Sequence, residues 1–310
     1  MIFVWSMACS RVSALMVMLR SARPIVRNHD AVMSKNISVK DVLAVVDGAP
    51  ASLTGVDQAV AYAGLHGATL TIIVVTENLA WAAAVDPMAY ANAMEASNTQ
   101  RKEHVMAVRE RIAGAAVHVE VHALFEAPGL LPGLARAEGQ YADIALVPGT
   151  GGWQSDGLRR HITEALMFAG VPTMVMPATW RPAPITHAAL GWNASLEAFR
   201  AARTILDLVE TGATVDVVVV DSLGGDKSDQ PAPGTRIARH LTRHGHNAVV
   251  HAIGSAEHGT SAALQLFAIE RHADVLVVGG YGRSRALEFI LGGVTRELIA
   301  RQRLPIVFVH

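Results

Sequence analysis

The chain carries one sequence pattern twice, and this repeat constrains its fold more than any other feature. Each copy opens with an apolar run that ends in a polar turn, and each closes with an apolar run whose second residue is proline. Four pairs of apolar runs correspond between the copies: 42–48 with 188–195, 70–75 with 215–220, 142–147 with 273–278, and 171–176 with 304–309. Such short apolar runs are typical of buried strands.

The segments between these runs predict amphipathic helices. In the first copy Val56, Ala59 and Ala63 fall on one helical face, and in the second Phe199 and Ala202 do so. Strands that alternate with helices indicate a parallel sheet covered on both faces. Right-handed crossovers then give a doubly wound sheet. The predicted fold class is α/β, with two doubly wound, five-stranded parallel-sheet domains.

Composition narrows the function classes. With 310 residues, 51% of them hydrophobic and 17% charged, the chain has enough apolar residues for about two ordinary domains. The formal net charge is −1, so nothing in the composition favours nucleic acid as a partner. The single cysteine, Cys9, cannot build a disulfide framework, which fits a cytoplasmic protein.

The domain boundaries follow from the repeat. We expect residues 1–36 to be an N-terminal extension outside the fold, residues 37–178 the first domain, and residues 185–310 the second. A proline-rich linker over residues 177–185 joins the domains. Met33 is read as the natural start. The alternative, a membrane anchor within residues 1–32, is disfavoured because the apolar stretch contains Arg11 and is short.

A glycine-rich block in the second copy carries the clearest chemistry. Its spacing is G-x2-G-x9-G-G-x-T from Gly279 to Thr295, after a predicted strand and before a helix expected at residues 294–301. Glycines let a backbone approach an anion, and the free N–H groups at a helix start point toward it. Arg283, Ser284 and Thr295 add donors. Taken alone, the block also fits a tight strand-to-helix turn.

This block resembles the ATP-binding signature of the universal stress protein family, and residues 277–298 closely resemble tandem proteobacterial members. The repeat extends the resemblance over about residues 39–310. It implies the adenine nucleotide α-hydrolase-like fold, strand order 3-2-1-4-5, with ATP at the carboxyl ends of strands 1 and 4. No sequence feature requires Mg²⁺.

The resemblance assigns nucleotide contacts residue by residue, and no catalytic or metal-binding residue. Asn193 takes the place of an adenine-side aspartate, and Gly293 takes the place of a serine or threonine. Clustered histidines at 240, 244 and 246 are read as a solvated helix end rather than a metal site. The predicted cofactor-binding residues are Asn193, Gly279, Gly282, Arg283, Ser284, Gly292, Gly293, Val294 and Thr295.

The first copy departs from the signature. Its loop at residues 148–152 is two residues shorter, and alignment places Arg159 and Arg160 where Gly292 and Gly293 stand. These arginines either hold a phosphate or are exposed helix residues, and we favour the second reading. The first domain is therefore expected to be a structural partner that has lost ATP.

Three functions are compatible with these observations. The first is an ATP-binding stress-response regulator with an unidentified protein partner, the second a nucleotide-free interaction or scaffold protein of the same fold, and the third, least favoured, a slow ATPase. We expect the last strands, residues 173–176 and 306–309, to pair within the chain as a pseudo-dimer, because unpaired apolar edges aggregate. A further homodimer stays open.

Overall fold

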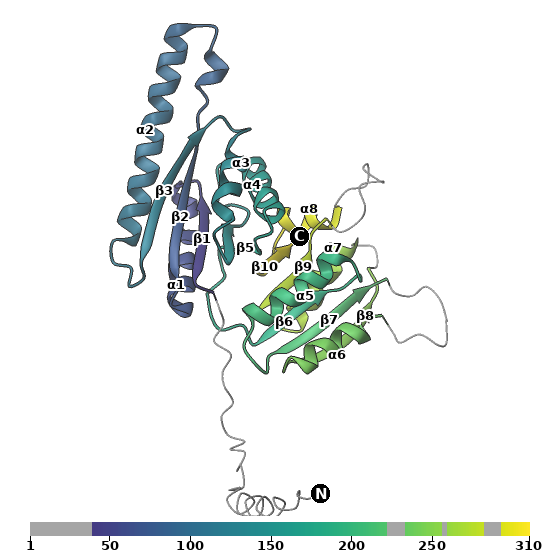
Figure 1. Cartoon of the computed structure of the whole chain (residues 1–310). Coiled ribbons are helices and arrows are strands. Elements are labelled where there is room, and N and C mark those ends of the chain that lie inside the picture. The colour runs from purple at the N-terminus through teal and green to yellow at the C-terminus, as the bar shows by residue number, and fades with distance from the viewer. Residues whose placement is uncertain (1–38, 222–232, 256–258, 282–292) are drawn as a thin grey trace, which may run out of the picture. The chain divides into compact units, whose positions relative to one another are not determined.

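A computed structural model describes residues 39–221, 233–255, 259–281 and 293–310 (Figure 1). The chain divides into two units, Met1–Ser34 and Lys35–His310, and the described residues all belong to the second. The extension predicted at residues 1–36 lies outside the described residues.

Strands and helices alternate in the order that the repeat predicts (Figure 1). The strands are β1 (Asp41–Val46), β2 (Thr69–Glu77), β3 (Val119–Glu126), β4 (Ile144–Pro148), β5 (Thr173–Met176), β6 (His187–Gly191), β7 (Thr214–Val220), β8 (Asn247–Ile253), β9 (Val275–Gly279) and β10 (Ile306–Val309). The helices are α1 (Leu53–His66), α2 (Pro87–Ile112), α3 (Leu131–Gly139), α4 (Asp156–Phe168), α5 (Leu196–Leu208), α6 (Thr235–Arg243), α7 (Gly259–Glu270) and α8 (Gly293–Ala300). Two short 3-10 turns, η1 (Pro50–Ser52) and η2 (Ala80–Ala83), precede α1 and α2.

The strands form one sheet in the order β3-β2-β1-β4-β5-β10-β9-β6-β7-β8. Counted from its own first strand, each half has the order 3-2-1-4-5, and the pairings inside each half are parallel. The predicted fold class and strand order are confirmed.

Helices cover both faces of the sheet. α1, α2, α5 and α6 pack on one face, whereas α3, α4, α7 and α8 pack on the other. The central strand β1 shows why its sequence is apolar throughout: Val42 and Ala44 join the core on one face, and Leu43 and Val45 join the core on the opposite face.

The halves join through their last strands. β5 and β10 pair antiparallel, with Val307 opposite Met174 and Phe308 opposite Thr173. Both strands are fully buried, so the apolar edges expected from the sequence are paired within the chain. Met167 of α4 also packs into the core cluster of the second half. The predicted pairing of the last strands is confirmed.

A buried carboxylate forms a polar cluster on the second half of the sheet. Asp216 of β7 is fully buried, and its two oxygens lie 2.9 Å from Nε2 of His187 on β6 and of His251 on β8. Arg271 Nε donates to the same carboxylate at 3.2 Å. Burial favours the neutral acid, but hydrogen bonds from His187, Arg271 and His251 outweigh it and leave the pKa of Asp216 below its usual 3.8.

No helix among the described residues combines the length and the hydropathy that crossing a bilayer would need.

We predict that Asp216→Asn lowers the free energy of unfolding by about 1–3 kcal/mol at neutral pH, because three donors lose a buried anion. A lowered folded pKa contributes stability above the unfolded pKa, and this stability is lost as the pH falls through the folded pKa. The difference from wild type should therefore be largest above about pH 4 and shrink below it. Urea denaturation followed by circular dichroism between pH 7 and pH 3 measures this difference.

The matched control is Glu270→Gln, which removes one negative charge from an exposed position at the end of α7. It should change stability by less than about 0.5 kcal/mol at every pH. Equal effects of the two variants would contradict a structural role for the Asp216 cluster.

Candidate functional site

The carboxyl ends of β6 and β9 define the candidate site. These strands are parallel neighbours, with Gly191 opposite Val278, and the chain leaves them toward α5 and α8. Ligands of open α/β sheets usually bind at such an edge. The predicted residues found there are Asn193 after β6, Gly279 at the end of β9, and Gly293, Val294 and Thr295 in the first turn of α8. The remaining predicted residues, Gly282, Arg283, Ser284 and Gly292, lie outside the described residues.

Asn193 shapes the turn between β6 and α5. Its Oδ1 accepts a hydrogen bond from Ser195 N at 3.1 Å, and the residue is exposed. Asp47, at the end of β1, accepts the equivalent bond from Ala49 N at 3.0 Å. The two residues therefore occupy corresponding turns in the two halves. Ala194 adopts a φ of 59°, a left-handed conformation that is uncommon for a residue with a side chain.

Gly279 allows the start of α5 to lie directly on the end of β9. A Cβ at this position would stand 2.5 Å from both Ala198 N and Glu197 C, which are backbone atoms. A glycine is therefore required for packing, in addition to any contact with a ligand. This packing brings the turn after β6 and the end of β9 together at one edge of the sheet.

The two described ends of the glycine block meet. Tyr281 N donates to Oγ1 of Thr295 at 3.4 Å, and Thr295 is only 5% exposed. Tyr281 itself has a φ of 57°. The chain thus leaves β9 and returns to the start of α8 at the same place, which is the arrangement that a strand–loop–helix anion site requires.

Tyr281 also binds the first half. Its hydroxyl donates to Oε1 of Glu164 on α4 at 2.7 Å, and its ring stacks on Phe168 with 5.4 Å between ring centroids. Burial and the neighbouring Glu164 carboxylate raise the pKa of Tyr281. Sequence analysis missed this contact because the partners are 117 residues apart and Glu164 belongs to no motif.

Arg159 corrects one interpretation made from the sequence. It was expected to be an exposed helix residue, but its side chain is 2% exposed, with NH1 donating to the carbonyl of Ile299 at 3.0 Å. Nε donates to Asp156 at 3.1 Å. The carbonyls near the end of a helix lack partners within that helix, and Arg159 supplies one for α8. Its role is to join α4 to α8.

The loop after β4 also contacts α8 in the second half. Gly149 N donates to Met176 O at 2.7 Å, which matches the bond from Gly280 N to Val309 O at 2.8 Å in the second half. Thr150 Oγ1 then donates to the carbonyl of Ala300 at 3.0 Å, at the end of α8. Each half therefore reaches the last helix of the other from the residues after its fourth strand.

The histidines do not form a metal centre among the residues with described positions. His240 and His244 lie with their ring centroids 4.6 Å apart at the end of α6. Within the described ranges, no three His, Cys, Asp or Glu side chains are arranged to hold a metal ion.

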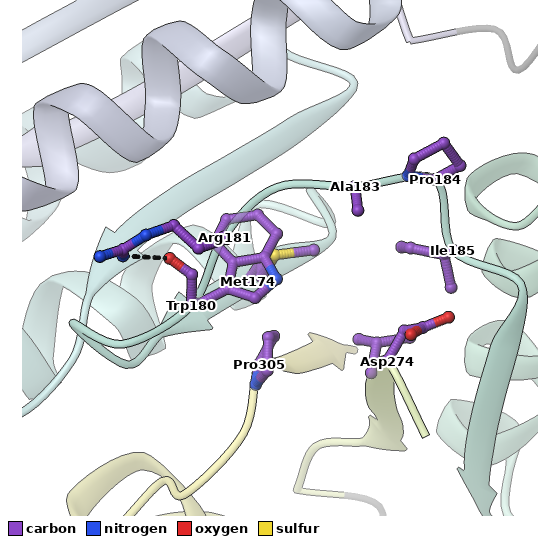
Figure 2. A pocket seen from close by; sticks show the side chains of 9 residues that line it. Met174, Trp180, Arg181, Ala183, Pro184, Ile185, Asp274 and Pro305 are labelled. Carbon is purple, nitrogen blue, oxygen red and sulfur yellow. Dashed lines mark hydrogen bonds between the residues drawn. The ribbon is translucent and has the colours of Figure 1, made fainter. Parts of the chain in front are cut away.

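A pocket of about 180 Å³ lies at the opposite end of the strands (Figure 2). Asp274, which precedes β9, accepts hydrogen bonds from Thr186 N and His187 N at 2.8 and 2.9 Å. Figure 2 shows that Arg181 points away from this carboxylate; it donates to Trp180 O at 3.0 Å. These groups fasten the linker, so the pocket belongs to the packing between the halves.

Comparison with known proteins agrees with this architecture. Residues 38–152, within the first half, match the model of the universal stress protein family. No curated protein matches the chain.

Two solved structures share the fold over both halves. A universal stress protein from Archaeoglobus fulgidus DSM 4304 is 15% identical with a TM-score of 0.62, and the match covers 87% of this chain and 95% of that one. A Pseudomonas aeruginosa UCBPP-PA14 structure with the same family name is 12% identical with a TM-score of 0.51, covering 88% and 94%. At these identities the likeness concerns the fold.

We predict that Gly279→Ala destabilises the protein by about 1–3 kcal/mol, because the new methyl group meets backbone atoms that cannot rotate away. Gly293→Ala is the control, since its methyl group would meet no described atom within 4 Å and Gly293 is part of a helix. Urea denaturation should show no loss for Gly293→Ala, and a similar loss for both variants would contradict the close packing at Gly279.

Arg159→Met should lower the free energy of unfolding by about 1–3 kcal/mol, because a buried carbonyl of α8 loses its donor. Arg136→Met, on the exposed side of α3, removes the same charge and should cost less than about 0.5 kcal/mol. Thermal and urea unfolding of both variants measure the difference, and an unaffected Arg159→Met would show that the contact between α4 and α8 is dispensable.

Proposed function

We propose that the chain is a tandem universal stress protein whose second half binds an adenine nucleotide, ATP, at the carboxyl ends of β6 and β9. One observation supports this most: the hydrogen bond between Tyr281 and Thr295 brings the two described ends of the glycine block together beside Gly279. A backbone returning to a helix start in this way can present N–H groups to phosphates.

The described residues fit such a ligand sterically. Among the described residues, no atom would lie within 4 Å of a Cβ added at Gly293, and Val294 is 39% exposed. The described residues therefore do not crowd the first turn of α8. Asn193, which is exposed, offers its side-chain amide at the end of β6, where the family resemblance implies the adenine.

Positive charge near the same place favours an anion. Arg160 of α4 and Arg296 of α8 both act on Tyr281 and oppose the rise in its pKa, so both cations lie near the described start of the block. Arg160 Nε is buried and has no hydrogen-bond partner among the described residues. A phosphate would supply an acceptor for such a donor.

The proposed role is binding rather than catalysis. In the cytoplasm, ATP binding would favour one conformation of the protein and so change how much of it presents the surface that a protein partner recognises. Hydrolysis would need a positioned base, and the site residues predicted here include none. The alternative function is a nucleotide-free interaction protein, in which Gly279, Gly280 and Tyr281 serve only the packing described above.

We predict that the full chain binds ATP in calorimetric titrations and that Gly293→Val weakens binding by about tenfold or more, because a branched side chain hinders close approach to the helix start. Gly133→Val is the matched control: Gly133 lies in the first turn of α3, and a Cβ there would likewise meet no described atom within 4 Å.

The outcomes separate the candidate functions. Equal ATP affinity in both variants would show that the nucleotide does not bind at the start of α8. No ATP binding by wild type would favour the nucleotide-free interaction protein. Phosphate release by wild type above the level of Gly293→Val would favour the ATPase.

A further inference from the structure

A pocket of about 480 Å³ lies where three parts of the chain meet beside the pair of β5 and β10. Because these strands are antiparallel, the end of β10 lies beside the start of β5. The volume falls in the range of about 300–1,000 Å³ that is typical of sites for small organic ligands. The lining comes from the turn between α4 and β5 (residues 168–170 and Pro172), from the end of β10 (Val309 and His310) and from α5 (Arg200, Arg203 and Thr204).

Two arginines give this pocket its charge. Arg200, Arg203 and Thr204 occupy positions i, i+3 and i+4 of α5, so their side chains share one face of the helix. Both arginines are exposed, so a guest can reach their guanidinium groups. Neither forms an ion pair with a carboxylate of the described residues, and the lining includes no aspartate or glutamate. The pocket therefore favours an anion.

Much of the remaining lining is apolar. It includes Phe168, Ala169, Pro172 and Val309, and Phe168 is 43% exposed although it is a large aromatic residue. Side chains at i and i+3 of a helix have Cβ atoms about 5–6 Å apart, and each guanidinium group can hold one carboxylate through two parallel hydrogen bonds. A guest with two carboxylates joined by a short hydrocarbon chain matches both features.

We propose that this pocket binds a small dicarboxylate. Arg200 and Arg203 each pair with one carboxylate, the hydroxyl of Thr204 donates to the carboxylate held by Arg200, and the hydrocarbon chain lies against Phe168 and Pro172. None of the predicted nucleotide contacts that have a described position lines the pocket. The dicarboxylate site is therefore a second site, and its existence does not depend on ATP binding.

The pocket shares residues with the start of the glycine block. His310 Nδ1 donates to Gly280 O at 3.1 Å, and Gly280 N donates to Val309 O at 2.8 Å. The ring of Phe168 contacts those of His310 and Tyr281, with 4.7 and 5.4 Å between ring centroids, respectively. A bound dicarboxylate should raise the ATP affinity, because it orders Phe168 and His310 before ATP binds. This coupling rests on the function proposed above.

Glutarate is the probe, titrated by calorimetry into the full chain at low ionic strength and without ATP. The comparison ligands are glutaramide, which has the same length but no charge, and inorganic phosphate, which has the charge but no hydrocarbon chain. We expect saturable binding of glutarate. Binding should be weaker by about tenfold or more for each of the other two, since each lacks one of the features that the lining favours.

Arg203→Met should weaken glutarate binding by about tenfold or more, because one carboxylate loses a charged, bidentate partner while an apolar side chain is kept. Arg239→Met is the matched control: Arg239 is an exposed arginine of α6 in the same half, and it does not line the pocket. Its glutarate affinity should equal that of wild type.

Three results would each overturn the dicarboxylate site: heat that grows without saturation, equal affinity for glutarate and phosphate, or equal losses in Arg203→Met and Arg239→Met. Each would show that the arginines attract anions only as surface charges.

ATP titrations with and without saturating glutarate measure the coupling. We expect ATP affinity to rise about fivefold or more with glutarate, and an unchanged ATP affinity would overturn the coupling. Absence of ATP binding by wild type would contradict the proposed function instead, and the glutarate titrations, which contain no ATP, would still decide the dicarboxylate site.

Discussion

The antiparallel pair of β5 and β10 determines where the other contacts between the halves can form. It joins two parallel sheets edge to edge, so α4 and α8, which flank the pair on one face, lie against each other. Arg159 can then reach the carbonyl of Ile299, and Tyr281 can reach Glu164. These bonds link α4 to α8 and the segment after β9 to α4. The candidate site in the second half is thus supported by residues of the first.

This arrangement explains why the halves could diverge. In the second half the segment after β9 begins with Gly280 and Tyr281, and Tyr281 N donates to Thr295 at the beginning of α8. In the first half the corresponding segment is closed over Asp47 by Gln154, while Arg159 is committed to α8. The sequence position that is predicted to contact phosphates in the second half is Arg159 in the first half, where the side chain instead joins two helices. The pairing of β5 with β10 does not involve the carboxyl-end loops, so these loops can differ between the halves while the sheet is kept.

The strands and their pairing could be predicted from sequence because both depend on local patterns. Apolar runs of strand length mark each strand, and the final runs, whose second residue is proline, mark the edges that must pair. The role of Arg159 was predicted wrongly, since an arginine in a helix is usually exposed and its partner, the carbonyl of Ile299, is 140 residues away. The Asp216 cluster was missed for the same reason: His187, Asp216 and His251 meet only once β6, β7 and β8 are aligned in register.

Helix α4 carries positive charge to the candidate site of the second half. Arg160 of α4 and Arg296 of α8 both act on Tyr281, so both cations lie near the described start of the glycine block, and Arg160 comes from the opposite half. Arg159, one residue earlier on α4, donates to the carbonyl of Ile299 near the end of α8. Basic residues of α4 therefore act across the β5–β10 pair, and the charge around the candidate site of the second half depends on residues of the first.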